Sequence, residues 1–310
     1  MNQTAKGSMP ITPRVTRPGN RSVTRSLSAS LLMMVVLALT ACSIVRLAYN
    51  QADHLAYWQL NRAFDFTDEQ SVKVKGAIKQ WFQWHRRTQL PVYVPFLARA
   101  EKEALAPVSP ALVCERRTEL EGWGRKAIDQ AVPAMADLVL SLSPDQIKHL
   151  EKHQAKTNED FRNDYLEDSM DDRNKAAAKF VIKVAEIFYG RLEASQRDHV
   201  KSEIAALPLN AQNVLEERQV YQRDFVQLIR QLNAQKATQA QAQQALRELF
   251  QQFFDPPKEP LRGQRLQWIA AGCKLTSSLH QQTTPVQKEK AAQRLRDWES
   301  DLRILNKQPA

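Results

Sequence analysis

The chain is poor in two residue types on which many folds and sites depend. Only 8 of its 310 residues are glycine and 3 are cysteine. Few positions therefore favour the positive φ angles of tight hairpins, whereas the helix-forming residues Ala, Gln, Leu, Arg and Lys are abundant. This composition predicts an all-α fold, a multi-helix bundle of about eight to ten helices.

The sequence also lacks the short motifs of common enzyme classes. It contains no G-x-S-x-G, no P-loop and no dinucleotide-binding glycine fingerprint. We therefore expect no cofactor, and the sequence identifies no enzyme.

One acidic run keeps an enzymatic alternative open. Its carboxylates are Glu159, Asp160, Asp164, Glu167, Asp168, Asp171 and Asp172. A hydrolase or transferase acting on envelope polymers would need two of them in a cleft, roughly 5–9.5 Å apart. The interleaved Arg162 and Arg173 favour instead a charged, exposed helix face, and the run lacks the spacing of a calcium loop.

A pair of histidines raises the question of a metal site. His149 and His153 are four residues apart, the spacing of two ligands on one helix face. The local string is HLEKH rather than HExxH, so the glutamate of zinc proteases is displaced by one position. Two solvated histidines are the simpler interpretation, and we predict no metal site.

The basic charge balance is partly a property of the N-terminal segment. The whole chain carries a formal net charge of +10, but residues 1–41 contain five Lys and Arg and no acid. The remaining chain has 39 basic and 34 acidic residues, a net charge of +5. We therefore expect no nucleic-acid partner, because proteins of that class concentrate charge on one patch.

The N-terminal segment has the layout of a signal peptide. A basic lead precedes the uncharged apolar run Leu31–Leu39, which ends in Leu39-Thr40-Ala41-Cys42. This ending resembles a bacterial lipobox, in which the thiol of Cys42 takes a diacylglycerol and becomes the mature N-terminus. The prediction is a lipoprotein signal peptide over 1–41 and a mature helical domain over 42–310, with a subdivision near residue 208 as an option.

An uncleaved membrane anchor is the main alternative, and a cytosolic protein is another. The uncharged span of about 17 residues is at the lower limit for crossing a hydrocarbon core of about 30 Å. Ser43 resembles the outer-membrane sorting pattern rather than the inner-membrane aspartate signal. We expect a lipid-anchored protein of the cell envelope that faces the periplasm, at the outer membrane.

Two cysteines remain after Cys42 is assigned to the lipid. Cys114 and Cys273 form an even pair in a compartment that oxidises thiols, which predicts a disulfide between them. Two buried free thiols are the alternative.

Helix starts recur along the chain as capping boxes. Thr67 and Gln70, Ser143 and Gln146, and Thr284 and Gln287 have the hydroxyl at the N-cap and the amide three residues later; residues 192–196 are a degenerate fourth copy. Their uneven spacing favours similar caps on separate helices rather than a solenoid. Pro91 and Pro95 predict that the helix beginning at Thr67 stops and is followed by a short extended link.

One stretch has the chemistry of an interface. Trp84, His85, Arg86 and Arg87 follow Trp81, and aromatic residues with arginine are favoured in binding hot spots. Upstream of this stretch, Leu55 and Trp58 are expected in short helical pieces packed near the membrane end.

Two resemblances follow from these residues. Arg46–Gln51, Trp58 and Trp84–Pro91 resemble an uncharacterised family of Gram-negative lipoproteins, known as a domain of unknown function. This resemblance implies an envelope location and no activity. The segment Leu142–Gln146 is similar to the L-T-x-x-Q motif of the small Spy/CpxP-type periplasmic proteins, although position 143 is serine and Phe66 replaces the leucine in another copy.

The sequence as a whole predicts a lipid-anchored helical module of unknown specific function. We expect it to bind envelope proteins or polymers, in a protein-interaction or chaperone-like role, rather than to transform them. The membrane would be its partner through the lipid on Cys42.

Overall fold

The computed structural model describes residues 44–308 apart from 167–168, 208–210, 258 and 260. Contacts divide the chain into Met1–Ile44 and one compact unit, Val45–Ala310. The predicted signal peptide and Cys42 lie outside the described residues. None of the helices in the described ranges is long and apolar enough to cross a membrane.

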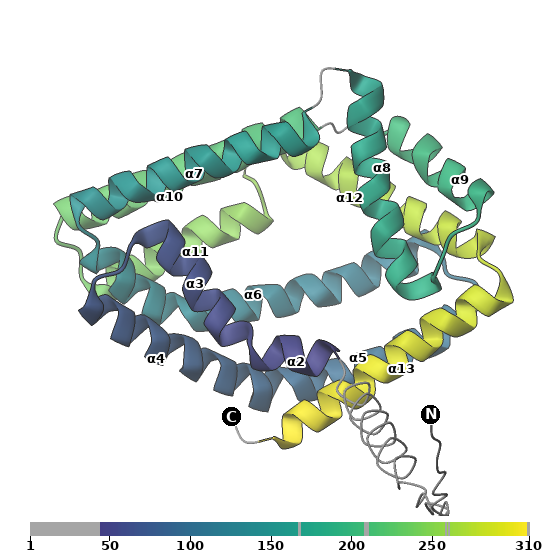
Figure 1. The fold of residues 1–310 in the computed structure, drawn as a ribbon. Helices are drawn as coiled ribbons and strands as arrows, with labels where there is room; N and C mark the ends of the chain where they lie inside the picture. The colour runs from purple at the N-terminus through teal and green to yellow at the C-terminus, as the bar shows by residue number, and fades with distance from the viewer. Residues whose placement is uncertain (1–43, 167–168, 208–210, 258, 260, 309–310) are drawn as a thin grey trace, which may run out of the picture. The chain divides into compact units, whose positions relative to one another are not determined.

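The described residues confirm the predicted all-α fold and contain no strand. The helices are α2 (Ile44–Asn50), α3 (Ala52–Phe64), α4 (Asp68–Trp84), the π-helical turn η1 (His85–Gln89), α5 (Leu90–Ala104), α6 (Pro110–Ser141), α7 (Pro144–Tyr165), α8 (Met170–Tyr189), α9 (Ala194–Ala205), α10 (Ala211–Ala234), α11 (Gln239–Phe254), α12 (Leu261–Gln282) and α13 (Pro285–Lys307). Several helices pack against each other in antiparallel orientation: α5 against α13, α6 against α11 and α12, and α7 beside α10 (Figure 1).

The predicted break at Pro91 and Pro95 is wrong. Helix α4 continues through η1 into α5, with Pro91 in the first turn of α5 and Pro95 inside it. The π-helical turn changes the hydrogen-bond register, and the Leu90 N–H donates to the carbonyl of His85. Pro91 is in a first turn, where proline is tolerated, and α5 accommodates Pro95 in its interior without ending there.

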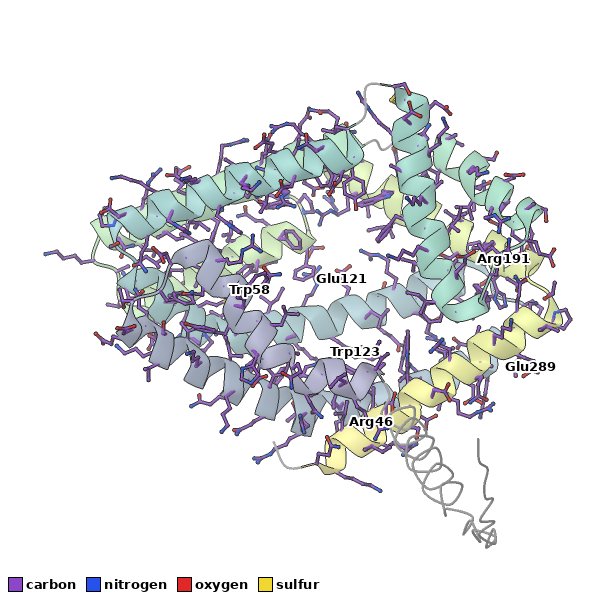
Figure 2. All side chains as sticks on the ribbon, viewed as in Figure 1. Arg46, Trp58, Glu121, Trp123, Arg191 and Glu289 are labelled. Atoms are coloured by element: carbon purple, nitrogen blue, oxygen red, sulfur yellow. A yellow bond between two sulfur atoms is a disulfide. The ribbon has the colours of Figure 1, made fainter. Side chains whose placement is uncertain are left out.

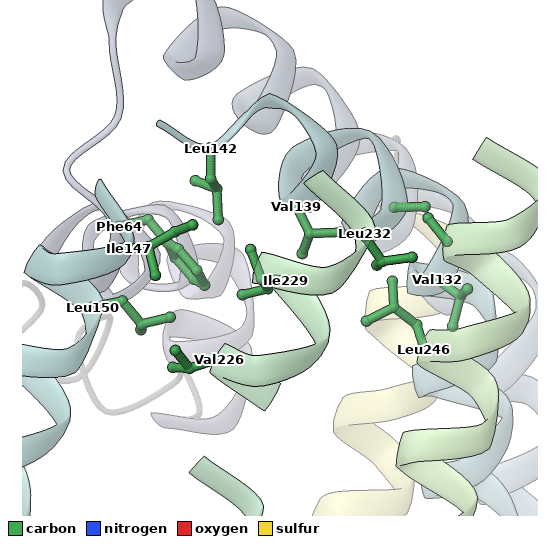
Figure 3. Packing of buried hydrophobic residues seen from close by; sticks show 12 residues of the cluster. Phe64, Val132, Val139, Leu142, Ile147, Leu150, Val226, Ile229, Leu232 and Leu246 are labelled. Carbon is green, nitrogen blue, oxygen red and sulfur yellow. The ribbon is translucent and has the colours of Figure 1, made fainter. Parts of the chain in front are cut away.

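The larger core cluster lies where five helices meet (Figure 3). It takes Phe64 from α3 and buried aliphatic side chains from α6, α7, α10 and α11. Val132, Ile229 and Leu246 are fully enclosed in it. This cluster stabilises the region where α3 and α6 end and α7 begins.

A smaller cluster joins α8, α9 and α12. Its buried residues include Ala178, Val200 and Leu279. The predicted disulfide lies beside it and ties α6 to α12 through Cys114 and Cys273, whose Cα atoms are 5.5 Å apart. The smaller apolar cluster is therefore supplemented by a covalent bond.

The predicted capping boxes form, and their glutamines have a second role. In what we call the first glutamine junction, Gln146 Nε2 donates to Gln70 Oε1 at 2.7 Å, and Gln70 Nε2 donates back to Gln146 Oε1 at 3.3 Å. Gln70 also donates to the carbonyl of Ser141, and Gln146 donates to that of Asp65. The starts of α4 and α7 are thereby joined to each other and to the preceding chain.

A second glutamine junction joins α9 and α13 in the same way. Gln196 Nε2 donates to Gln287 Oε1 at 2.7 Å, and Gln287 Nε2 donates to Gln196 Oε1 at 2.9 Å. Their remaining N–H groups donate to the carbonyls of Gln282 and Arg191. The degenerate copy at 192–196 is thus a full partner in this junction.

Candidate functional site: an aromatic groove between α5 and α6

The predicted interface stretch begins in an internal cluster centred on His85. The His85 ring lies stacked near Trp81, with centroids 5.0 Å apart. Its Nδ1 is 2.9 Å from the hydroxyl of Tyr49, and its Nε2 is 3.2 Å from that of Tyr93. Burial lowers the pKa of His85 to about 4, so the ring is neutral at neutral pH. A neutral imidazole has one N–H, and therefore one tyrosine donates to it and the other accepts from it.

Arg86 is also engaged within the molecule. Its guanidinium donates to Asn50 Oδ1 at 3.0 Å and lies over the ring of Tyr49. Burial raises the pKa of Tyr49 to about 12, so this hydroxyl keeps its proton. Trp84 is half-buried and Arg87 is exposed. The binding role of this stretch stays a prediction, but two of its four side chains clearly hold α2 against η1.

The structure places a groove beside this cluster, between α5 and α6. Its volume is about 380 Å³, and Val92, Phe96 and Trp123 contribute its apolar walls. The side chain of Trp123 projects from α6 (labelled in Figure 2). Trp123 packs edge to face on Phe96 with centroids 4.9 Å apart, and its ring centroid is 4.4 Å from that of Tyr93. A continuous set of aromatic contacts therefore leads from His85 to the groove.

A glycine and a charged rim shape the opening of the groove. Gly122 lies in its wall, and a Cβ atom added there would meet nothing within 4 Å. On the rim, Arg99 pairs with Glu119 at 2.5 Å, and the exposed Lys126 lies close by. An aromatic floor with a charged rim is suited to an apolar side chain whose neighbours are polar.

A second groove, between α7 and α10, is lined mostly by residues with polar side chains. It has a volume of about 660 Å³ and is lined mainly by glutamine, arginine and glutamate side chains, together with Ala155, Val226 and the buried Asn158. Asn158 Nδ2 donates to Gln222 at 2.7 Å, and within the described chain its Oδ1 has no hydrogen-bond partner. This groove has no aromatic floor comparable to that between α5 and α6.

The other predicted chemical groups are not assembled into a site. Asp160 pairs with Lys156, and both Asp171 and Asp172 pair with Lys175, all on exposed surface. Glu167 and Asp168 lie outside the described residues. His149, which is half-buried, contacts the carbonyl of Arg62 through Nε2. Across the described ranges, no three His, Cys, Asp or Glu side chains are grouped so that they could hold a metal ion.

One protein-family model matches the chain. A family model described as a family of unknown function, DUF6279, matches residues 62–256, more than half of the sequence. The chain belongs to the DUF6279 family. The DUF6279 match contains the first glutamine junction, His85 with Trp81 and Tyr93, and every residue that lines the groove between α5 and α6, whereas Tyr49 lies before it. It ends before α12 and α13, which carry Cys273 and Gln287.

Two further comparisons return nothing. No curated protein matches the chain, and no solved structure matches it. Membership of DUF6279 therefore brings no activity with it.

The sequence did not predict this groove, although one signal was present. Val92, Phe96 and Arg99 follow one another at spacings of four and three, which places them on one helix face. The assumption of an extended link at Pro91 and Pro95 hid this periodicity. The contribution of α6 depends on tertiary packing and has no local signal.

Proposed function

We propose that this DUF6279 protein is a lipid-anchored, periplasm-facing binding module that holds an apolar side chain of another envelope protein in the groove between α5 and α6. The observation that carries the proposal is the aromatic groove, with its open wall at Gly122. Its volume, about 380 Å³, is suited to one or two large side chains rather than to a folded domain.

The surroundings of the groove support a protein ligand. Tyr93, Phe96 and Trp123 are held by packing on one another, so little side-chain entropy is lost when a partner binds. Rigid aromatic residues beside arginine are typical of the anchor pockets that dominate protein–protein affinity. The ion pair of Arg99 with Glu119 gives the rim both signs of charge.

The proposed location follows from the N-terminal sequence and from the cysteines. The lipobox-like ending at Cys42 supports lipidation, and the pairing of Cys114 with Cys273 is typical of an oxidising compartment. The enzymatic alternative has less support, because the described carboxylates of the 159–172 run are exposed or paired with lysine rather than gathered in a cleft.

The groove can be tested by filling it without disturbing the fold. Gly122→Leu places a large side chain in the open wall, and leucine favours a helix by about 0.5–1 kcal/mol relative to glycine. Gly76→Leu is the matched control, because Gly76 is exposed on α4 and also has open space at its Cβ position. Partners crosslinked in intact envelopes should fall at least about tenfold with Gly122→Leu and remain with Gly76→Leu, a difference of about 1.4 kcal/mol.

The groove, the lipid anchor and the predicted interface at Arg87 can be tested separately. Equal recovery of the same partners by Gly122→Leu and the wild type would exclude the groove as the binding site. Incorporation of labelled palmitate in the wild type, and its loss in Cys42→Ala, tests the anchor independently. Arg87→Ala in the same crosslinking assay tests whether the interface predicted from sequence contributes to binding.

A further inference from the structure

The helices that follow the anchor site expose apolar residues where polar ones are expected. On α2 and α3, Leu47 is 61% exposed, Leu55 57% and Trp58 51%, and Ile44, the first residue of α2, is 78% exposed. Solvent-facing helix positions usually carry charged or polar side chains. We call Leu47, Leu55 and Trp58 the α2–α3 apolar face.

The opposite side of α3 is also apolar, but it is packed. Phe64 belongs to the larger core cluster, and Leu60 and Ala63 pack against it. The hydroxyl of Tyr57 donates to Ser71 Oγ on α4 at 3.0 Å. Because the inner side of α3 is already packed, its outward apolar residues are available to a second apolar environment.

The covalent structure indicates what that environment is. Helix α2 begins at Ile44, two residues after Cys42. Two residues span at most about 7 Å even when fully extended. Acyl chains attached to Cys42 would therefore enter a bilayer immediately beside α2, and this argument rests on the lipidation in the proposed function.

The residues at the far end of the face suit a membrane interface. The guanidinium of Arg62 lies over the ring of Trp58, 4.7 Å from its centroid. Tryptophan is enriched at the level of the lipid headgroups, and arginine can reach phosphate from there. Leu55, Trp58 and Arg62 follow one another at spacings of three and four, along one line of α3.

We propose that the α2–α3 apolar face docks on the membrane, so that the helical body is held against the bilayer instead of being free on its lipid. Leu47, Leu55 and Trp58 enter the boundary between headgroups and acyl chains, and Arg62 contacts lipid phosphate. This adds a protein surface to the lipid anchor as a second membrane contact.

The test measures contact of Trp58 with lipid in the lipidated, full-length mature protein. The protein is incorporated into vesicles of phosphatidylethanolamine and phosphatidylglycerol, with or without bromine on the acyl chains, and tryptophan quenching by bromine is recorded. The wild type should be quenched, and Trp58→Phe should lose most of that quenching. Trp268→Phe is the matched control, because Trp268 is 41% exposed on α12, and it should keep the quenching.

A charge variant covers the case in which Trp58→Phe alters the fold. Leu55→Glu should reduce quenching of Trp58 several-fold, whereas Val72→Glu, at an exposed apolar position of α4, should not. Far-ultraviolet circular dichroism verifies that each variant is folded.

The outcomes distinguish docking from anchoring. If the protein floats with vesicles but Trp58→Phe is quenched as strongly as the wild type, docking is wrong and the anchor stands. If the wild type neither floats nor carries palmitate, the proposed anchor itself fails. Crosslinking of position 58 to a protein, with no bromine quenching, would assign the face to a protein partner and overturn the membrane assignment.

Discussion

The two glutamine junctions use the same bonds in different surroundings. In each, two glutamines at helix starts exchange side-chain amide hydrogen bonds and donate to carbonyls of the preceding chain. The first junction has hydroxyl N-caps, Thr67 and Ser143, and adjoins the larger core cluster. The second has Glu193 in one of these positions and adjoins the smaller cluster.

Additional specific bonds surround the second junction. The Cys114–Cys273 disulfide lies on α12, and in the same helix Ser277 and His280 hydrogen-bond to the carbonyls of Val108 and Ala106. Gln196 is 1% exposed, against 9% for Gln70. A small apolar cluster can therefore support the same junction when a cross-link and buried polar bonds supplement it.

A fifth capping box shows that capping by itself does not make a junction. Thr238 and Gln241 form the same reciprocal bonds at the start of α11, yet Gln241 is exposed. The amide of Gln241 accepts from Thr238, within its own helix start. Pairing of two boxes across helices is thus a tertiary feature.

The largest expected effect comes from removing the disulfide of α12, the helix that leads to the second glutamine junction. The disulfide closes a loop with a sequence separation of 159 residues. Replacing both cysteines with alanine should lower the free energy of unfolding by about 3–5 kcal/mol, measured by urea denaturation. Hydrogen exchange should accelerate in α9 and α12 more than in α4 and α7. Equal acceleration of hydrogen exchange in all four helices would contradict a specific role of the disulfide in stabilising α9 and α12.

A smaller effect should follow from removing one glutamine at a time. Gln196→Ala leaves the buried amide of Gln287 without its partner, and we expect a loss of about 2–3 kcal/mol. Gln70→Ala should cost somewhat less, because its site is less buried, and Gln241→Ala should cost less than about 1 kcal/mol. Thermal and urea unfolding of the three variants would rank them, and equal losses would show that capping rather than pairing matters.

The smallest expected effect is a loss of stability at low pH, through His280 on α12. His280 Nε2 faces the carbonyl of Ala106, so it donates, and Nδ1 accepts from the hydroxyl of Tyr189. Burial lowers the pKa of His280; the hydrogen bond to Ala106 opposes this shift, and the charge of Lys288 adds to it, so the net pKa is lowered. The folded protein takes up this proton less readily than the unfolded chain, so stability should fall as the pH drops below about 6.5.

The control for this prediction retains the donor but does not titrate. His280→Gln should show a smaller loss of stability between pH 7 and pH 5 than the wild type, in urea titrations at both values. The low pKa of His85 contributes equally to both proteins and cancels in the difference. An identical pH dependence in the two proteins would show that His280 does not contribute to the loss of stability in acid.

The local features of the fold were accessible from the sequence. Helix content, the capping boxes and the pairing of Cys114 with Cys273 follow from composition, short motifs and cysteine number, and the structure confirms them. The continuation of the helix through Pro91 and Pro95 was missed, because a π-helical turn has no reliable sequence signal.

Features that join distant residues were not accessible. Gln70 and Gln146 are 76 positions apart, and Gln196 and Gln287 are 91 apart, so nothing local indicates which boxes pair. The interface stretch was located by residue type, but type alone does not distinguish the inward His85 from the exposed Arg87. Leu55 and Trp58 were expected to pack, and instead they face outward.

The reciprocal amide bonds make each junction chemically vulnerable in one respect. Hydrolytic deamidation of Gln146 or Gln287 would replace two N–H donors with a carboxylate that faces main-chain oxygens, at Asp65 and at Arg191 respectively. Their low exposure limits access of water to these amides. The same burial that makes the bonds effective would therefore also protect a long-lived protein from this form of ageing.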